Sequence, residues 1–172
     1  MRIYKSETTA KYAADFFKDI HVICEKEMDD IEHAEIHVVP QDFKSKATKK
    51  GRALEWARQN IQTDKEYLLY IDEDTLITEF EGIPDVDICQ FTETPLYSGS
   101  ILTFYTEVYR VGYQTEQRSF NILRYPLYVW GGGVAIRRQL ENNITWDYDT
   151  ITEDTNFAWR SARNQPITFA TV

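Results

Sequence analysis

The sequence contains few cysteines, no long apolar run and fewer basic than acidic side chains. Its two cysteines, Cys24 and Cys89, both lie in apolar stretches, which favours reduced, buried thiols over a disulfide framework. No apolar run is long enough to cross a bilayer and no signal peptide is present, so we expect a cytoplasmic protein. The 19 basic and 28 acidic residues give a formal net charge of −9. This charge excludes nucleic acid and anionic lipid as main partners, because both bind basic surfaces.

The chain does have the length and the apolar content of one domain. Its 172 residues are 42% hydrophobic, and without a repeat or a linker, residues 1–172 are treated as a single domain. Hydrophobic patterning predicts helices and strands in alternation. The helices are expected at residues 7–17, 49–61, 100–120 and 152–162, and the strands at residues 2–5, 20–24, 35–39, 66–71, 86–91, 134–136 and 167–170. This order predicts a layered α/β fold with a mostly parallel central sheet flanked by helices.

An apolar strand followed at once by acids stands in the middle of the chain, at residues 66–75. Ligands of open α/β sheets bind beyond the carboxyl ends of such strands. If strand geometry continues, Asp72 and Asp74 point the same way and together can hold a hard divalent cation. The alternative is a strand that ends in a solvated acidic turn.

A second acidic cluster, Thr152-Glu153-Asp154, opens the last predicted helix. Thr152 fits an N-cap, and acids in a first helical turn complement the helix dipole. A carboxylate beside a bound acceptor hydroxyl can also act as a general base. The cluster alone leaves both interpretations open.

Two further segments suggest a ligand. Gly131-Gly132-Gly133 precede a strand and let a ligand approach the backbone closely, while Trp130 can stack on a sugar ring. Lys50 and Arg52 lie at a helix start, where a phosphate or a nucleotide can bind. Taken singly, these segments also fit a flexible turn, a core tryptophan and a solvated basic patch.

As an ordered set, these segments resemble family-2 inverting glycosyltransferases with the GT-A nucleotide-diphospho-sugar transferase fold. Within that family the resemblance is to the egghead-type β-1,4-mannosyltransferase branch and its prokaryotic relatives. It covers nearly the whole chain and is carried by VVP at 38–40, KGRAL at 50–54, YIDEDTL at 70–76, WGGG at 130–133 and TED at 152–154.

The resemblance implies a role for each matching position. Asp72 and Asp74 correspond to the DxD motif, which holds Mg²⁺ or Mn²⁺ on the donor diphosphate. Asp154 corresponds to the catalytic base, with Glu153 as its neighbour. The donor is expected to be a GDP- or UDP-sugar, and the acceptor a glycan or a lipid-linked hydroxyl. The residues implied to contact the donor or its nucleotide are Glu25, Lys50, Arg52, Asp72, Trp130, Gly131 and Gly132.

The chain departs from the family pattern at its carboxyl end. Relatives continue to a QxxRW motif, often followed by membrane helices, whereas this sequence stops at Val172 without that motif. We therefore expect a sequence that is cut short, with membrane association only through the missing segments and a location at the cytoplasmic face of a membrane.

Two other functions stay open: a non-catalytic nucleotide-sugar binding module, and a haloacid-dehalogenase-like phosphatase with Asp72 as nucleophile, from whose motif Leu76 departs.

Overall fold

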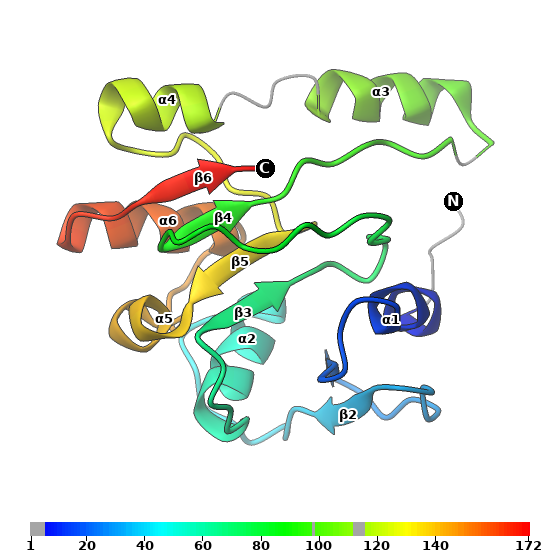
Figure 1. The fold of residues 1–172 in the computed structure, drawn as a ribbon. Helices are drawn as coiled ribbons and strands as arrows, with labels where there is room; N and C mark the ends of the chain where they lie inside the picture. The colour runs from blue at the N-terminus through cyan, green and yellow to red at the C-terminus, as the bar shows by residue number, and fades with distance from the viewer. Residues whose placement is uncertain (1–5, 98, 112–115) are drawn as a thin grey trace.

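The computed structural model describes residues 6–97, 99–111 and 116–172, and the α/β fold is confirmed (Figure 1). The strand predicted at residues 2–5 lies outside the described residues. A parallel pair is formed by β1 (His21–Cys24) and β2 (Glu35–Val38). The second sheet has four strands in the order β3 (Tyr67–Tyr70), β5 (Val134–Arg137), β4 (Ile88–Gln90) and β6 (Phe169–Thr171).

The prediction of a mostly parallel central sheet needs one correction. Strands β3, β4 and β6 point the same way, but β5 lies between β3 and β4 and runs antiparallel to both. Val134, the first residue of β5, pairs with Tyr70 at the end of β3 and with Gln90 at the end of β4. The glycine loop before Val134 therefore reaches the carboxyl edge of the sheet, and β5 returns from that edge.

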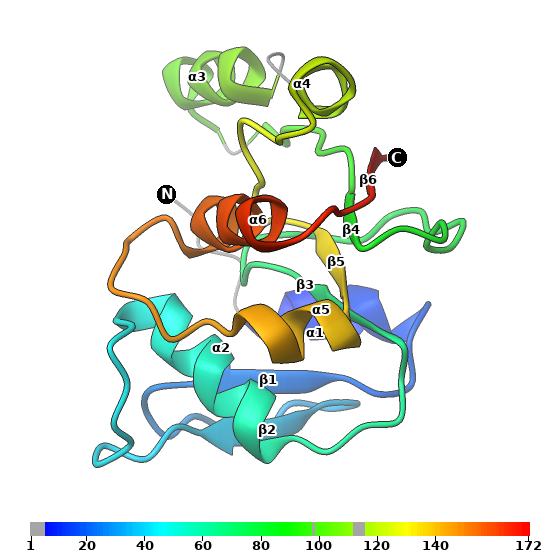
Figure 2. The same cartoon turned by 90° about the vertical axis from the view of Figure 1, so that its left-hand side faces the viewer.

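The helices match the predicted ones in place, with one division and one addition. They are α1 (Ser6–Ala14), α2 (Lys49–Asn60), α3 (Ile101–Val111), α4 (Glu116–Leu123), α5 (Arg138–Ile144) and α6 (Glu153–Asn164). The single helix predicted at 100–120 corresponds to α3 and α4, and residues 112–115 between them are not among the described ones. In both views α3 and α4 lie at one end of the molecule and the two-stranded sheet at the other (Figures 1 and 2). Within the described ranges, no helix is both long and apolar enough to cross a bilayer.

Helix α5 was not predicted because it is short and mostly polar. It buries Leu140, Glu141 and Ile144, and only two of these are apolar. Both cysteines are unpaired thiols, as predicted, although Cys24 is half-buried where Cys89 is fully buried.

The core lies around Trp146, between the four-stranded sheet and the helices α5 and α6. The Trp146 ring stacks on Phe157 of α6 at 4.4 Å and meets the edge of Tyr70 of β3 at 5.5 Å. Ile88 and Ile136 complete the contact with the sheet. Figure 2 looks onto the face that α2, α5 and α6 cover.

A polar network is buried inside this core. Glu141 is fully buried, and one of its carboxylate oxygens accepts hydrogen bonds from the Tyr70 hydroxyl and from Trp146 Nε1, the latter at 2.7 Å. Glu55 of α2 is also buried; it accepts the Trp146 backbone N–H at 2.8 Å and pairs with Arg58 at 2.6 Å. The network ties α2, α5 and β3 together, which fixes where α2 begins and where β3 ends.

Replacing Glu141 by alanine is expected to lower the free energy of unfolding by about 2–4 kcal/mol. The reason is that two buried donors, on Tyr70 and Trp146, lose their acceptor. Glu141→Gln keeps an acceptor oxygen and is expected to cost less, and Glu79→Ala on the exposed surface is the control. Urea denaturation measures the difference; equal midpoints for Glu141→Ala and Glu79→Ala would contradict the role of the network.

Candidate functional site

Four of the predicted site residues meet around one ammonium group. Lys50 Nζ lies 2.6 Å from Asp72 Oδ1, 3.3 Å from Glu153 Oε1 and 3.2 Å from Asp154 Oδ2. We call these four residues the Lys50 cluster. The side chains of Glu153 and Asp154 are 14% and 11% exposed, against 38% for Asp72. One cation therefore stands among three carboxylates, with one side of the group open to solvent.

Three element ends bring the cluster together. Lys50 is in the first turn of α2, Asp72 follows β3, and Glu153 and Asp154 begin α6. Gly51 packs against the start of α6, where a Cβ at this position would stand in ordinary contact with the Glu153 Cβ at 3.5 Å. Thr152 is at the N-cap of α6 as predicted, but its side chain makes no capping hydrogen bond.

The glycine loop closes over the cluster at Gly131. A Cβ on Gly131 would stand 2.7 Å from Asp154 Oδ2 and 2.8 Å from Asp72 Oδ2, and would overlap Lys50 Nζ. Real side chains do not approach this closely, so glycine is required for the cluster to keep its arrangement. The fold thus places the glycine loop directly beside the acids of the Lys50 cluster.

Two residues that were not predicted from the sequence also contact this loop, and one of them, Gln90, holds it by hydrogen bonds. Gln90 is buried; its Oε1 accepts the Trp130 backbone N–H at 2.7 Å and its Nε2 donates to the Gly133 carbonyl at 2.7 Å. Glu93 reaches Gly132, where a Cβ would overlap its carboxylate. The sequence does contain one indication of the role of Gln90, because it is a polar residue in an otherwise apolar strand. A polar side chain buried in a sheet needs hydrogen-bond partners.

The Trp130 side chain is half-buried and stacks on Tyr128, with ring centroids 5.7 Å apart and an interplanar angle of 18°. The Tyr128 ring is exposed. The two rings form an aromatic surface beside the glycine loop. Its use in binding a sugar stays a prediction.

Burial and charge set unusual proton affinities in the Lys50 cluster. Burial raises the pKa of Asp154 to about 7; Lys50 opposes this shift and the adjacent Glu153 adds to it. Burial alone would lower the pKa of Lys50, but Asp154, Asp72 and Glu153 together raise it. The Asp154 shift thus comes mainly from burial, and the Lys50 shift from the three carboxylates around it. Asp154 Oδ1 is buried and, within the described part of the chain, has no hydrogen-bond partner.

The strand does not continue through the acids that follow β3. The expectation that Asp72 and Asp74 point the same way, which required strand geometry at these residues, is therefore corrected. The strand ends at Tyr70, and the Thr75 N–H donates to the Asp72 carbonyl at 3.0 Å in a tight turn. Asp74 is exposed in this turn, whereas Asp72 joins the Lys50 cluster. Carboxylate oxygens are the ligands that Mg²⁺ and Mn²⁺ prefer, and Asp72 and Asp74 line the same cavity. The two side chains therefore have the chemistry of a hard-cation site, with Lys50 as the present partner of Asp72.

Arg52 and Glu25 pair with each other rather than with the cluster. Arg52 Nη1 lies 2.6 Å from Glu25 Oε2, and its Nη2 donates to the carbonyls of Pro40 and Phe43 at 2.5 and 3.2 Å. Arg52 therefore fastens the loop after β2 to α2. The nucleotide contacts predicted for Arg52 and Glu25 stay predictions.

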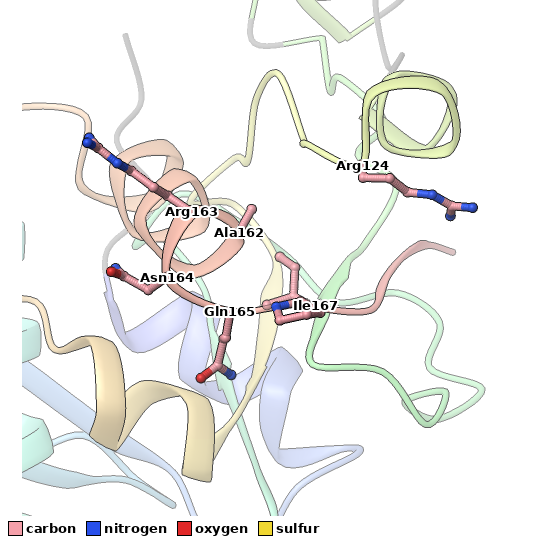
Figure 3. Close-up of a pocket in the computed structure, with 7 residues that line it drawn as sticks. Arg124, Ala162, Arg163, Asn164, Gln165 and Ile167 are labelled. Atoms are coloured by element: carbon pink, nitrogen blue, oxygen red, sulfur yellow. The ribbon is translucent and has the colours of Figure 1, made fainter.

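One large cavity carries four of the predicted residues. It measures about 1090 Å³, lies between α1, β1, α2 and β3, and is lined among others by Glu25, Lys50, Asp72 and Asp74. A separate open hollow of about 590 Å³ lies at the end of α6, between Arg124 and residues 162–167 (Figure 3). In Figure 3 Arg124 and Arg163 point away from one another. None of the site residues predicted from the sequence lines this second hollow, and we assign no function to it.

The raised pKa of Asp154 predicts that this residue lowers stability in its charged form. Between its ordinary pKa of 3.8 and about 7 the folded state holds a proton that the unfolded state releases, so this group's contribution to stability falls as pH rises through that window. Asp154→Asn is expected to raise the free energy of unfolding by roughly 1–4 kcal/mol at pH 8, and by less at pH 5. Thermal denaturation at both pH values measures this, with the exposed Asp64→Asn as control. Greater destabilisation at pH 8 than at pH 5 would show that the ion pair with Lys50 outweighs burial.

Comparison with known proteins identifies the family of the chain. The chain is 26% identical over 173 residues to "Beta-1,4-mannosyltransferase egh" of Drosophila melanogaster, an alignment that covers 87% of this chain and 38% of that protein. The chain thus spans well under half the length of this relative. No solved structure matches the chain significantly. A family model described as "Glycosyl transferase family group 2" matches residues 67–169, from β3 to the start of β6. The chain therefore belongs to glycosyl transferase family group 2, and its mixed α/β architecture is of the GT-A type.

Proposed function

We propose that this chain transfers a sugar from a nucleoside-diphosphate sugar to an acceptor hydroxyl with inversion at the anomeric carbon, and that Asp154 is the general base. The observation that carries the proposal is the state of Asp154 in the Lys50 cluster. Its carboxylate is buried, has one oxygen without a described partner, and has a pKa near 7. A base is most effective when its pKa lies near the working pH.

Asp154 and its neighbours support a single displacement. Asp154 takes the proton of the acceptor hydroxyl while the acceptor oxygen bonds to the anomeric carbon. The bond between that carbon and the diphosphate oxygen breaks, and its electron pair leaves with the diphosphate. Attack from the face opposite the leaving group inverts the configuration. Glu153 keeps the surroundings of Asp154 negative, which maintains the proton affinity of this base.

Lys50 and the acids after β3 serve the donor in this proposal. Lys50 orients Asp72 through the 2.6 Å contact and brings positive charge to the place where the diphosphate would lie. Asp72 and Asp74 would hold Mg²⁺ or Mn²⁺, which supplies charge neutralisation for the leaving diphosphate when bound. Glu25 lines the same cavity and is proposed to face the base or ribose, with Arg52 holding it in place.

The glycine loop leaves room for the sugar. Gly131 and Gly132 present backbone next to the Lys50 cluster, and Trp130 and Tyr128 add an aromatic surface beside it. Aromatic rings pack against the C–H faces of sugars, which favours the loop as the donor-sugar and acceptor side of the site. Since the relative is a mannosyltransferase by name, we propose a mannosyl donor carried by GDP or UDP, and a glycan or lipid-linked acceptor.

Asp154→Asn is expected to reduce transfer by about 10²–10⁴-fold, because the acceptor hydroxyl loses its proton acceptor. In the wild-type chain, kcat/KM is expected to fall about tenfold per pH unit below pH 7, where Asp154 becomes protonated. Release of nucleoside diphosphate from GDP-mannose in the presence of an acceptor, with Mn²⁺ supplied, measures both effects. Retention of near wild-type transfer in Asp154→Asn would exclude this residue as the base.

Donor binding is testable without turnover. A nucleoside diphosphate that binds only the folded chain raises the melting temperature by mass action. We expect GDP or UDP to raise it more with Mn²⁺ than without, and Asp72→Asn to remove the difference that depends on metal. Asp64→Asn, on the exposed segment before β3, is the matched control. A metal-dependent shift that survives in Asp72→Asn would contradict the metal assignment.

The two measurements together separate the enzyme from a non-catalytic binding module. Metal-dependent binding of a nucleotide without transfer, also after the chain is extended with a segment that carries the QxxRW motif, favours the binding module. The family match and the buried Asp154 favour the enzyme and give no support to the phosphatase alternative.

A further inference from the structure

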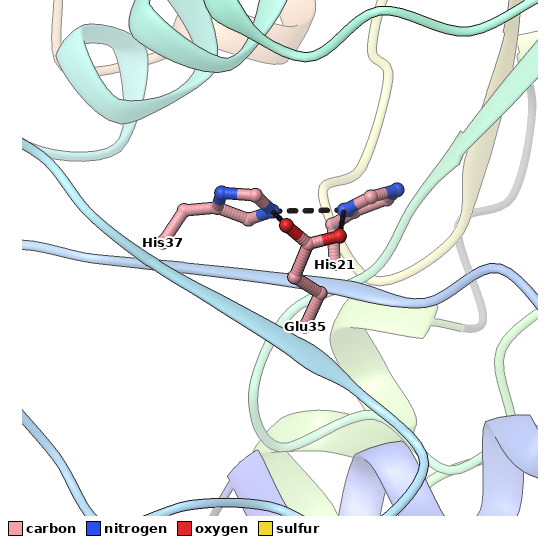
Figure 4. A group of neighbouring side chains, drawn as sticks. All are labelled: His21, Glu35 and His37. Atoms are coloured by element: carbon pink, nitrogen blue, oxygen red, sulfur yellow. Dashed lines mark hydrogen bonds and ion pairs between the residues drawn. The ribbon is translucent and has the colours of Figure 1, made fainter.

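A second group of metal-binding side chains lies on the two-stranded sheet. Strands β1 and β2 pair in parallel with His21 opposite Glu35 and Ile23 opposite His37. Because side chains alternate along a strand, His21, Glu35 and His37 lie on the same face. Figure 4 shows the carboxylate of Glu35 between the two imidazole rings.

The three side chains bring their ligand atoms to one point. His21 Nδ1 lies 2.9 Å from His37 Nε2, and the two oxygens of Glu35 lie 3.6 Å from these two nitrogens. Ligands 2.0–2.2 Å from a tetrahedral zinc ion are roughly 3.3 Å apart. The observed separations are therefore within a few tenths of an ångström of a coordinating arrangement. Among the described residues, no other three His, Cys, Asp or Glu side chains bring ligand atoms within 4.8 Å of one another.

Asp19 sets the orientation of the first imidazole. Its Oδ1 lies 3.0 Å from His21 Nε2, so the proton of a neutral His21 ring is held on that nitrogen and the lone pair of Nδ1 faces His37 and Glu35. Histidines that bind metals commonly donate their other N–H to a carboxylate in this way. This contact is independent of the three ligand atoms and points to the same use.

The surroundings favour a bound cation. His37 is 16% exposed and its ring lies 5.8 Å from that of Trp56, while Glu35 is 68% exposed and leaves the site accessible. The carboxylates of Asp19 and Glu35 both lie beside the imidazole rings, which surrounds the point where the ligand atoms meet with acidic side chains.

We propose that His21, Glu35 and His37 form a Zn²⁺ site with one open coordination position, separate from the proposed donor-metal site. Two imidazoles and one carboxylate suit zinc, whereas Mg²⁺ and Mn²⁺ prefer an all-oxygen set such as Asp72 and Asp74. The bound ion joins β1 to β2. A two-stranded sheet has little stability of its own, so zinc is expected to stabilise the part of the fold that carries Glu25 and Arg52.

The test is zinc binding by the untagged chain, measured by equilibrium dialysis and elemental analysis. We expect about one zinc per chain and a rise in melting temperature of about 5–10 °C at a zinc concentration ~100 times the dissociation constant. His37→Gln and His21→Gln are expected to weaken binding at least about tenfold. The matched control is His33→Gln, because His33 is exposed and outside the group; it should keep full binding. Asp72→Asn should also keep it, which separates this site from the donor site.

Two further variants guard against loss of folding. Glu35→Gln changes an exposed side chain, and Asp19→Asn changes only the orienting contact; we expect about 10-fold weaker binding from each. Circular dichroism without metal establishes that every variant is folded. The proposal is overturned if the wild-type chain binds no stoichiometric zinc, or if His33→Gln and His37→Gln bind zinc equally. Loss of zinc binding in Asp72→Asn alone would place the ion at the Lys50 cluster and would also overturn it.

Discussion

The candidate site depends on one ammonium group that three carboxylates share. Lys50 compensates Asp72, Glu153 and Asp154 only in part, so burial leaves Asp154 with a proton affinity far above that of an ordinary aspartate. The same shortage of positive charge makes the pocket receptive to a further cation. The contacts of Lys50 thus influence the protonation of the proposed base, Asp154. They also leave a net negative charge that a bound cation would offset.

The cluster stays assembled because the core beneath it is rigid. Trp146 receives support from Glu55 of α2 and Glu141 of α5, and it stacks on Phe157 of α6. Helix α2, which carries Lys50, and helix α6, which begins with Glu153, are therefore both held against Trp146, α2 through its backbone N–H and α6 through its ring. A buried charge that is incompletely paired lowers stability, and the packing of this core offsets that cost.

The parts of the site that could be predicted from the sequence are those that local sequence patterns determine. Asp72 follows an apolar strand and Asp154 lies at the start of a helix, and short apolar and capping patterns are enough to indicate both. The antiparallel direction of β5 could not be predicted, because local patterns do not determine which strands become neighbours. Gln90 was missed for a related reason: its partners lie about forty residues away, and a single polar residue in a strand does not reveal them. The turn at Asp72 depends on a backbone hydrogen bond that leaves no trace in composition.

The position of β5 between β3 and β4 restricts how this chain can vary. Inserting or deleting one residue at the junction of Gly133 and Val134 would shift β5 against both neighbours and turn Val134 and Ile136 from the core toward the opposite face. At this junction we therefore expect substitutions to be tolerated better than insertions or deletions.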